Sequence, residues 1–159
     1  MKRLGYENGR LDKVDETILT TLVENGRTTT AELARKVKLS SPSVAERVKR
    51  LEEAGIITGY SANVSAEAIG LPIAVWFRVR PVPGEMQRVA EIIQSIPEIT
   101  QCDRVTGEDC FLARANLASI AGMERVIDLI VPYAMTNTSI IQSSPVERRL
   151  PPLPIAEQD

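Results

Sequence analysis

The alternation of strand-like and helix-like segments in residues 71–146 restricts the fold of this chain more than any other feature. Apolar residues recur at helical spacing in two stretches: Met86 to Ile96, and a stretch that Ser119 caps and Pro132 ends. Runs rich in β-branched and apolar residues surround them. The resulting strand–helix–strand–strand–helix–strand order is that of a ferredoxin-like βαββαβ domain. The four strands are expected at 73–79, 99–105, 110–115 and 138–143.

Three helices are predicted before this domain, in an arrangement typical of a winged helix-turn-helix. The first begins after Asp12, a good N-cap, and stops at Asn25-Gly26. A short second helix is expected to open after Thr28-Thr29-Thr30, with Thr30 capping a weak Thr-x-x-Leu start. The third follows Ser41-Pro42, where the proline favours Ser41 as the N-cap and fits the first helical position. The chain is therefore predicted to be α+β, with an N-terminal winged helix-turn-helix followed by the ferredoxin-like domain.

Charge is divided unevenly between the two predicted parts. Residues 1–63 carry a net charge of +2 and residues 64–159 a net charge of −4, although the whole chain has a net charge of only −2. Seven basic and two acidic residues fall in the segment 27–50. A basic module joined to an acidic one favours polyanion binding by the first. We predict a helix-turn-helix domain at 1–55, a linker ribbon at 56–70, the ferredoxin-like domain at 71–146 and a Pro-rich tail at 147–159.

The third predicted helix is the candidate DNA-recognition element. Its apolar seam is narrow and its opposite face is polar and basic, which suits a helix lying in the DNA major groove. Arginine can form two hydrogen bonds to guanine, and hydroxyls near helix starts commonly hold phosphates. A small bundle with a solvated charged face has the same pattern, and this alternative stays open. The candidate DNA contacts are Thr28, Thr29, Ser41, Ser43, Glu46, Arg47, Lys49 and Arg50.

The absence of histidine argues against catalysis and metal binding, because it removes histidine triads, histidine bases and most zinc sites. Cys102 and Cys110 are spaced poorly for a metal site, and no nucleophile–base pair can be assembled. The predicted central strands carry a single aromatic residue, Phe111, which argues against RNA binding by base stacking. No apolar run approaches the roughly 20 residues that span a bilayer. We predict no catalytic residues, no metal, no cofactor and no membrane partner.

Six short stretches stand out by their order and spacing along the chain. Together they resemble the Lrp/AsnC family of transcription regulators, also called the leucine-responsive or feast/famine family. The similarity extends roughly from Leu11 to Pro151. The stretches read LDKVD at 11–15, ENGR at 24–27, AELA at 31–34, LSSPSVAERVKRLEEAGII at 39–57, VTGED at 105–109 and TNTSII at 136–141.

The resemblance implies a sequence-specific DNA-binding transcriptional regulator whose activity or assembly responds to a small effector, in this family an amino acid. It also implies that the second domain binds the effector and forms dimers through its sheet, and that the dimers assemble into octamers. The implied partners are double-stranded DNA, an amino acid and copies of the chain itself, in a cytoplasmic, nucleoid-associated protein. The implied effector contacts lie near the hairpin at Gly107: Thr106, Gly107, Glu108, Asp109, Cys110, Phe111, Asn116, Thr136 and Thr138.

This chain departs from the family pattern at two of these positions. Many relatives carry an acidic residue where it has Cys110, and often where it has Asn116. The hairpin still offers carboxylates for an ammonium group, and N–H and hydroxyl donors for a carboxylate. Two alternatives stay open: a solvated β-turn at Gly107, and an architectural DNA-organising protein with no small-molecule effector.

Overall fold

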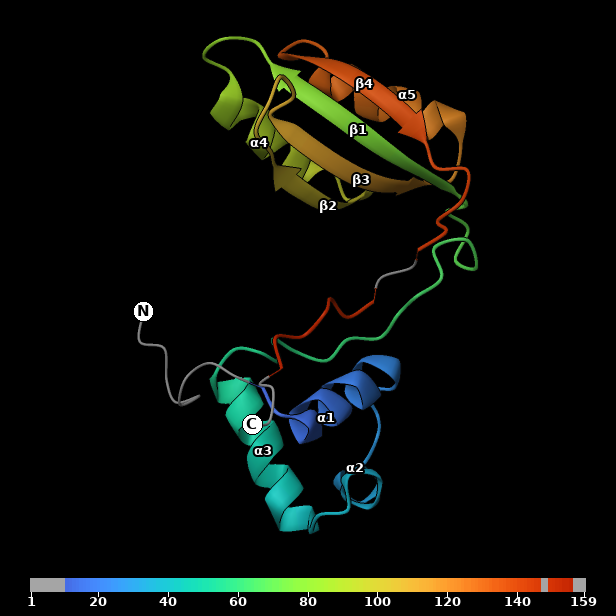
Figure 1. Cartoon of the computed structure of the whole chain (residues 1–159). Coiled ribbons are helices and arrows are strands. Elements are labelled where there is room, and N and C mark those ends of the chain that lie inside the picture. Colours follow the sequence, from blue (N-terminus) through green and yellow to red (C-terminus); the bar gives the residue numbers. More distant parts are fainter. Residues whose placement is uncertain (1–10, 147–148, 156–159) are drawn as a thin grey trace. The chain divides into compact units, whose positions relative to one another are not determined.

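The computed structural model describes residues 11–146 and 149–155, and these form two compact units (Figure 1). The first unit contains residues 11–63, together with residue 146 and residues 149–155 near the end of the chain. The second unit contains residues 64–145. The sheet domain is therefore inserted, in sequence terms, into the helical unit.

Three helices form the first unit: α1 (Lys13–Glu24), α2 (Thr30–Val37) and α3 (Ser41–Glu53). Fully or nearly fully buried apolar side chains from all three make a single core, while the ribbon after α3 contributes Ile57 at its edge. The predicted helix-turn-helix arrangement is present. The buried core residues of the helices are Ile18, Leu19, Leu33, Ala34, Val44 and Leu51.

The N-caps of α2 and α3 lie one residue earlier than expected. Thr29, not Thr30, caps α2, because its hydroxyl accepts the Glu32 N–H while the Glu32 carboxylate accepts the Thr29 N–H. Ser40, not Ser41, caps α3, since its hydroxyl accepts the Ser43 N–H. Side-chain partners three residues ahead therefore decide both helix starts. Asp12 caps α1 as expected.

The last part of the chain joins the helical unit. Leu150 and Leu153 pack against its core, and Ile155 forms a parallel β-bridge with Leu11. The sequence predicted a separate Pro-rich tail at 147–159. Its described part, residues 149–155, groups with the helices, and residues 147–148 and 156–159 lie outside the described residues.

The ribbon that follows α3 carries no regular strand between residues 54 and 72. It is anchored to the helical unit by Tyr60, whose hydroxyl donates a hydrogen bond of 2.9 Å to Glu52. Burial and this interaction with the Glu52 carboxylate raise the pKa of Tyr60 to about 12, so the phenol stays a donor at neutral pH. Residues 56–63 belong with the helices, whereas residues 64–70 belong with the sheet unit.

The second unit has the predicted ferredoxin-like order, and its four strands pair in the sequence β2-β3-β1-β4, all antiparallel. The predicted last strand begins too late: β4 starts at Ala134, four residues before Thr138, directly after the turn that ends the second helix. The elements are β1 (Ile73–Pro81), α4 (Met86–Ser95), β2 (Ile99–Arg104), β3 (Phe111–Leu117), α5 (Ile120–Ile130) and β4 (Ala134–Ile140).

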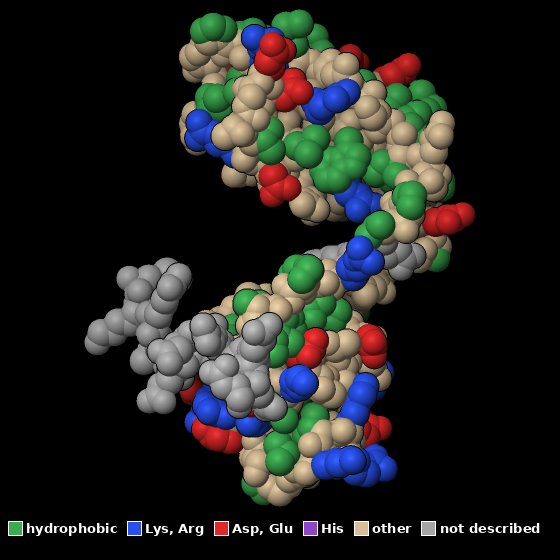
Figure 2. All heavy atoms as spheres, viewed as in Figure 1, with side chains coloured by type: hydrophobic (Ala, Val, Ile, Leu, Met, Phe, Trp, Pro, Cys, Tyr) green, Lys and Arg blue, Asp and Glu red, His purple; other side chains and the backbone are tan. Residues whose placement is uncertain are grey.

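Helices α4 and α5 cover one face of this sheet, and the other face is left open (Figure 1). Phe77 lies at the centre of the covered face, fully buried between neighbouring strands and both helices. The alternation along β1 sends Trp76 and Arg78 to the opposite face. Figure 2 shows apolar side chains near the middle of this open face, with charged side chains around them.

Candidate functional site

The outward face of α3 presents four exposed polar side chains: Ser43, Glu46, Lys49 and Arg50. Their spacing of three or four residues places them along one side of the helix, because an α-helix repeats every 3.6 residues. Val44 and Leu51 hold the opposite side in the core and are fully buried. The burial of Val44 and Leu51 therefore fixes which side of α3 faces solvent.

The hydroxyl groups proposed for phosphate contacts are partly occupied within the unit. Thr28 is half-buried and donates to the Asn25 carbonyl oxygen at 2.8 Å, and the Thr29 hydroxyl lies 2.8 Å from a Glu32 carboxylate oxygen. Hydrogen bonds from the Thr29 backbone and hydroxyl lower the pKa of Glu32 below its usual value. Ser41 is exposed at the first turn of α3. Of these three residues, Ser41 is the most available to an approaching phosphate.

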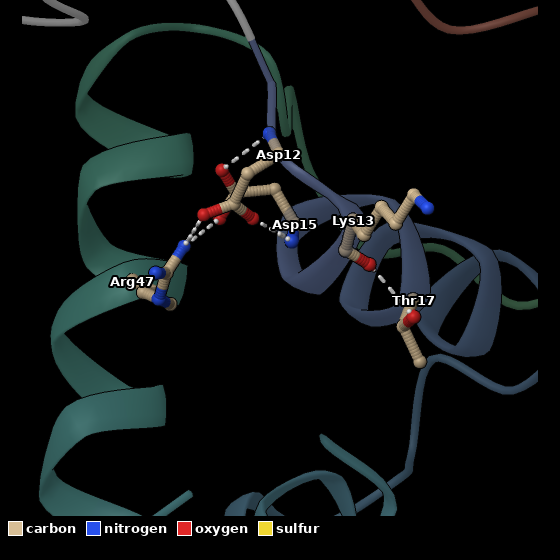
Figure 3. A network of polar contacts seen from close by, with 5 residues as sticks. All are labelled: Asp12, Lys13, Asp15, Thr17 and Arg47. Carbon is tan, nitrogen blue, oxygen red and sulfur yellow. Dashed lines mark hydrogen bonds and ion pairs between the residues drawn. The ribbon is translucent and has the colours of Figure 1, made fainter. Parts of the chain in front are cut away.

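The Arg47 side chain points from α3 toward the start of α1 (Figure 3). Its Nη1 atom donates to Asp12 Oδ2 and to Asp15 Oδ1, both at 2.8 Å. The Arg47 side chain is only 23% exposed, and that of Asp15 only 3%. Sequence reasoning placed Arg47 on the basic outer face. Instead, its guanidinium group joins α3 to the first turn of α1.

The two carboxylates that receive Arg47 are oriented by the start of α1. Asp12 accepts the Asp15 N–H at 2.8 Å, and Asp15 accepts the Asp12 N–H at 3.3 Å, which makes a capping box (Figure 3). Burial alone would raise the pKa of Asp12, but the Asp15 N–H and the Arg47 guanidinium outweigh it and lower that pKa. Burial alone would lower the pKa of Arg47, and its bonds to both carboxylates raise it above its usual value. Asp12 and Arg47 therefore stay charged at neutral pH.

Sequence reasoning missed this cluster, although the sequence contains a signal for it. Asp12 and Asp15 have the spacing of a capping box, and Arg47 lies three residues after Val44 and four before Leu51, beside the apolar seam. A buried charge is costly unless an opposite charge and hydrogen bonds satisfy it. Because Arg47 lies at the edge of the buried apolar side of α3, a carboxylate partner for it could have been expected from the sequence.

The second candidate site is the hairpin between β2 and β3. Two backbone bonds of 3.0 Å hold its base, from the Val105 N–H to the Cys110 oxygen and from the Cys110 N–H to the Val79 oxygen. Gly107 has φ 115°, a conformation that other residues rarely adopt, and the space beside its Cα is open. Arg80 reaches the hairpin and pairs with Glu108 at 3.6 Å, where both side chains are exposed.

The structure brings only some of the predicted effector residues together. One row across the sheet at the hairpin end contains Phe111, Val79 and Thr136. Thr138 lies two residues further along β4, opposite Phe77. Asn116 lies opposite Ala74, five residues away along β1, or about 17 Å at the strand rise. The Phe111 side chain is buried in the core. Thr106, Gly107 and Glu108 are exposed, and Asp109 and Cys110 are half-buried, as are Thr136, Thr138 and Asn116.

Residues 11–146 and 149–155 contain no helix long and apolar enough to cross a bilayer. Within the same ranges, no group of three or more His, Cys, Asp or Glu side chains is arranged to hold a metal ion. Both thiols are free: Cys102 faces Ala113 across the β2–β3 pair, and Cys110 lies at the base of the hairpin.

A three-helix unit with a polar outward α3, joined to a separate sheet domain, defines a helix-turn-helix DNA-binding protein with a second functional domain. Two family models match these parts. Residues 11–58 match a winged helix-turn-helix DNA-binding domain, and residues 74–151 match the Lrp/AsnC ligand-binding domain.

The chain belongs to the Lrp/AsnC family of DNA-binding transcriptional regulators. It is 37% identical to the transcriptional regulator LrpC of Bacillus subtilis over 134 residues, which cover 84% of this chain and 93% of LrpC. Identity to LrpA of Mycobacterium tuberculosis is 31%, covering 82% of this chain and 88% of LrpA. These relatives are transcriptional regulators, in agreement with the predicted class.

Solved structures of the family have the same fold. The structure of B. subtilis LrpC matches 87% of this chain and 99% of its own, with a TM-score of 0.82 and 35% identity. A transcriptional regulator of Neisseria meningitidis in complex with L-methionine matches 89% of this chain and 96% of its own, at 0.81 and 31%. A feast or famine regulatory protein of M. tuberculosis complexed with L-methionine matches 88% and 97%, at 0.79 and 29%. The predicted family and fold are thereby confirmed.

The lowered pKa of Asp12 predicts a pH dependence of the stability of the helical unit. Because this pKa is lower in the folded protein than in the unfolded chain, the Asp12 carboxylate stabilises the fold fully above its unfolded pKa of about 3.9. The contribution is lost as pH falls through the lowered folded value. We expect Asp12→Asn, which keeps a capping oxygen, to cost about 0.5–1 kcal/mol at pH 7, reduced by solvent screening, and almost nothing near pH 2.

Urea unfolding of the helical unit, followed at pH 7, 4 and 2, measures this difference. Glu46→Gln is the matched control, because Glu46 is exposed and forms no ion pair or side-chain hydrogen bond among the described residues. A cost of Asp12→Asn that is equally large at pH 7 and pH 2 would contradict the role of its charge.

Proposed function

We propose that the chain binds specific double-stranded DNA sites through the outward face of α3 and that an amino acid bound by the sheet domain modulates this activity. The first half rests on one observation: α3 turns Ser43, Glu46, Lys49 and Arg50 to solvent while the core fixes its opposite side. A helix held in this way can enter the major groove with its orientation already set.

In this proposal the basic residues of α3 divide into two roles. Arg50 and Lys49 are the exposed cations that meet DNA, with Ser41 and Ser43 near the helix start suited to phosphate or base contacts. The Lys49–Glu53 pair, at 3.8 Å and exposed, contributes little and does not compete strongly with a phosphate. Arg47 serves as a positioning residue, since its charge is already used by Asp12 and Asp15. Thr28, Thr29 and Glu46 complete the candidate surface.

The amino-acid effector is proposed for the Gly107 hairpin. An amino acid needs an acceptor for its ammonium group and donors for its carboxylate, and the exposed Glu108 and Thr106 beside Arg80 offer both kinds of group. Two structural neighbours are complexes with L-methionine, which supports an amino-acid ligand for this domain. Asp109, Cys110 and Thr136 lie at the same end of the sheet, whereas Asn116 and the buried Phe111 side chain are weaker candidates.

Dimers are proposed to form through the open face of the sheet and to assemble into octamers. Trp76 and Leu112 lie half-buried on this face, and the Nε atom of Arg114 is buried there without a hydrogen-bond partner among the described residues. A second sheet would cover the apolar side chains and could supply that partner. Such an assembly acts where the chromosome lies, so we propose a cytoplasmic, nucleoid-associated location.

The alternative is an architectural DNA-organising protein with no effector. It would use the same α3 face, and the exposed position of the Arg80–Glu108 pair fits a hairpin that is merely solvated. The two functions differ in whether any small molecule binds the sheet domain.

Removal of single cations on α3 is predicted to separate base reading from charge attraction. Arg50→Ala should weaken binding to a selected DNA site by about 1–3 kcal/mol and relax sequence choice, as expected for loss of a base contact. Lys49→Ala should weaken all DNA sequences similarly and reduce the slope of log K against log salt by about one. Fluorescence anisotropy with labelled duplexes across a salt series measures both.

Arg104→Ala provides the control, because Arg104 is an exposed arginine of the sheet unit. It removes the same charge without touching α3 and should leave both affinity and slope unchanged. If Arg50→Ala and Lys49→Ala behave like Arg104→Ala, the outward face of α3 is not the DNA-binding surface.

Thermal melting with each of the twenty amino acids tests the effector. A ligand that binds only the folded state at 100 times its Kd adds about 2.7 kcal/mol of stability, so the effector should raise the Tm of the sheet unit clearly. Glu108→Ala should abolish that rise, while Glu124→Ala, which removes an exposed carboxylate on α5, should keep it. No rise with any amino acid would favour the architectural alternative.

A further inference from the structure

The Pro-rich segment 149–155 has no role in the DNA-binding or effector sites, yet it contacts the helical unit at several points. Leu150 and Leu153 pack against the core that Leu11 completes, and Ile155 pairs with Leu11 through the backbone. Leu11 itself is only 5% exposed. Both ends of the described chain therefore contribute to one core.

The sequence of this segment suits such a contact. Prolines at 151, 152 and 154 favour the extended polyproline conformation, which has three residues per turn. Leu150 and Leu153 are three residues apart and therefore lie on the same edge of such a segment. Because proline residues already restrict the unfolded chain, docking this segment costs less conformational entropy than docking a flexible one.

The surface that faces the segment is the side of α1 turned away from α2 and α3. Glu16, Thr20, Val23 and Glu24 are exposed residues of α1 at positions i, i+4, i+7 and i+8, which form one stripe. They line a shallow hollow of about 470 Å³ together with residues 149–153. Arg149 brings a positive charge to a hollow that holds two carboxylates. Residues 149–153 form one wall of this hollow and α1 forms the other, so apolar packing and charge both favour the contact between them.

We propose that residues 149–155 dock on α1 as a second tether, so that the sheet domain holds the DNA-binding unit by two chain connections instead of one. The chain leaves the helical unit at residues 63–64 and re-enters it at residues 145–146. A domain inserted at two points loses much of the orientational freedom that a single linker allows. This second connection leaves the sheet unit at residue 145, and the chain lies beside α1 from residue 149 onward. A change in the sheet domain can therefore reach the DNA-binding unit along two paths.

Two readouts on the full-length protein test the tether. The double variant Leu150→Asp/Leu153→Asp places charges in the packed positions and should release the segment. We expect amide hydrogen exchange in α1 to become about tenfold faster, because the segment no longer stabilises this part of the core. Nitrogen-15 relaxation should show the rotational correlation time of the helical unit falling toward that of a separately tumbling domain.

Val146→Asp/Pro154→Asp is the matched control, because it adds the same charge just before and within the segment, at two exposed positions outside the hollow. It should leave both readouts at the wild-type values. Equal exchange in α1 for the two double variants would overturn the docking. Faster exchange with an unchanged correlation time would overturn the tether, since the segment would then stabilise α1 without restraining the unit. Neither readout involves DNA or an effector, so failure here is distinct from failure of the proposed function.

Discussion

The ion pairs between Arg47 on α3 and the carboxylates of Asp12 and Asp15 set the geometry on which the proposed DNA-binding surface depends. A single guanidinium nitrogen bonds both carboxylates at 2.8 Å, and those carboxylates are themselves held by the capping box that starts α1. Moving α3 relative to α1 would leave the buried Asp15 charge without its partner, which is costly in a low-dielectric environment. Helix α3 is therefore fixed by electrostatics as well as by the packing of Val44 and Leu51.

This use of Arg47 separates two roles that are adjacent in sequence. Lys49 and Arg50, two and three residues later, point outward and are free to meet phosphates and bases, whereas Arg47 is directed back into the unit. The net positive charge of residues 27–50 overstates the charge that DNA would meet, because part of it is neutralised inside the fold.

Local sequence patterns were sufficient for most of the fold. The helical periodicity around Ile18 and Val89 predicted the helices, because burial of one face imposes that period, and runs of β-branched and apolar residues predicted β1 and β3. The errors are local. The caps Thr29 and Ser40 depend on groups three residues away, and the first residues of β4, Ala-Met-Thr-Asn, lack the β-branched apolar run that marks a strand. Residues brought together from distant parts of the chain were beyond such patterns. Arg47 meets Asp15 across 32 positions, and Leu11 meets Ile155 across the entire sheet domain.

A double-mutant cycle between Arg47 and Asp15 tests the central claim most directly. Urea unfolding of Arg47→Met, Asp15→Asn and the double variant measures whether the two changes add; asparagine keeps the oxygen that accepts the Asp12 N–H. If Arg47 holds α3 through this carboxylate, the double variant will be about 1.5–3 kcal/mol more stable than the sum of the single effects predicts. Strict additivity would contradict the claim, because the ion pair would then contribute nothing to the position of the recognition helix.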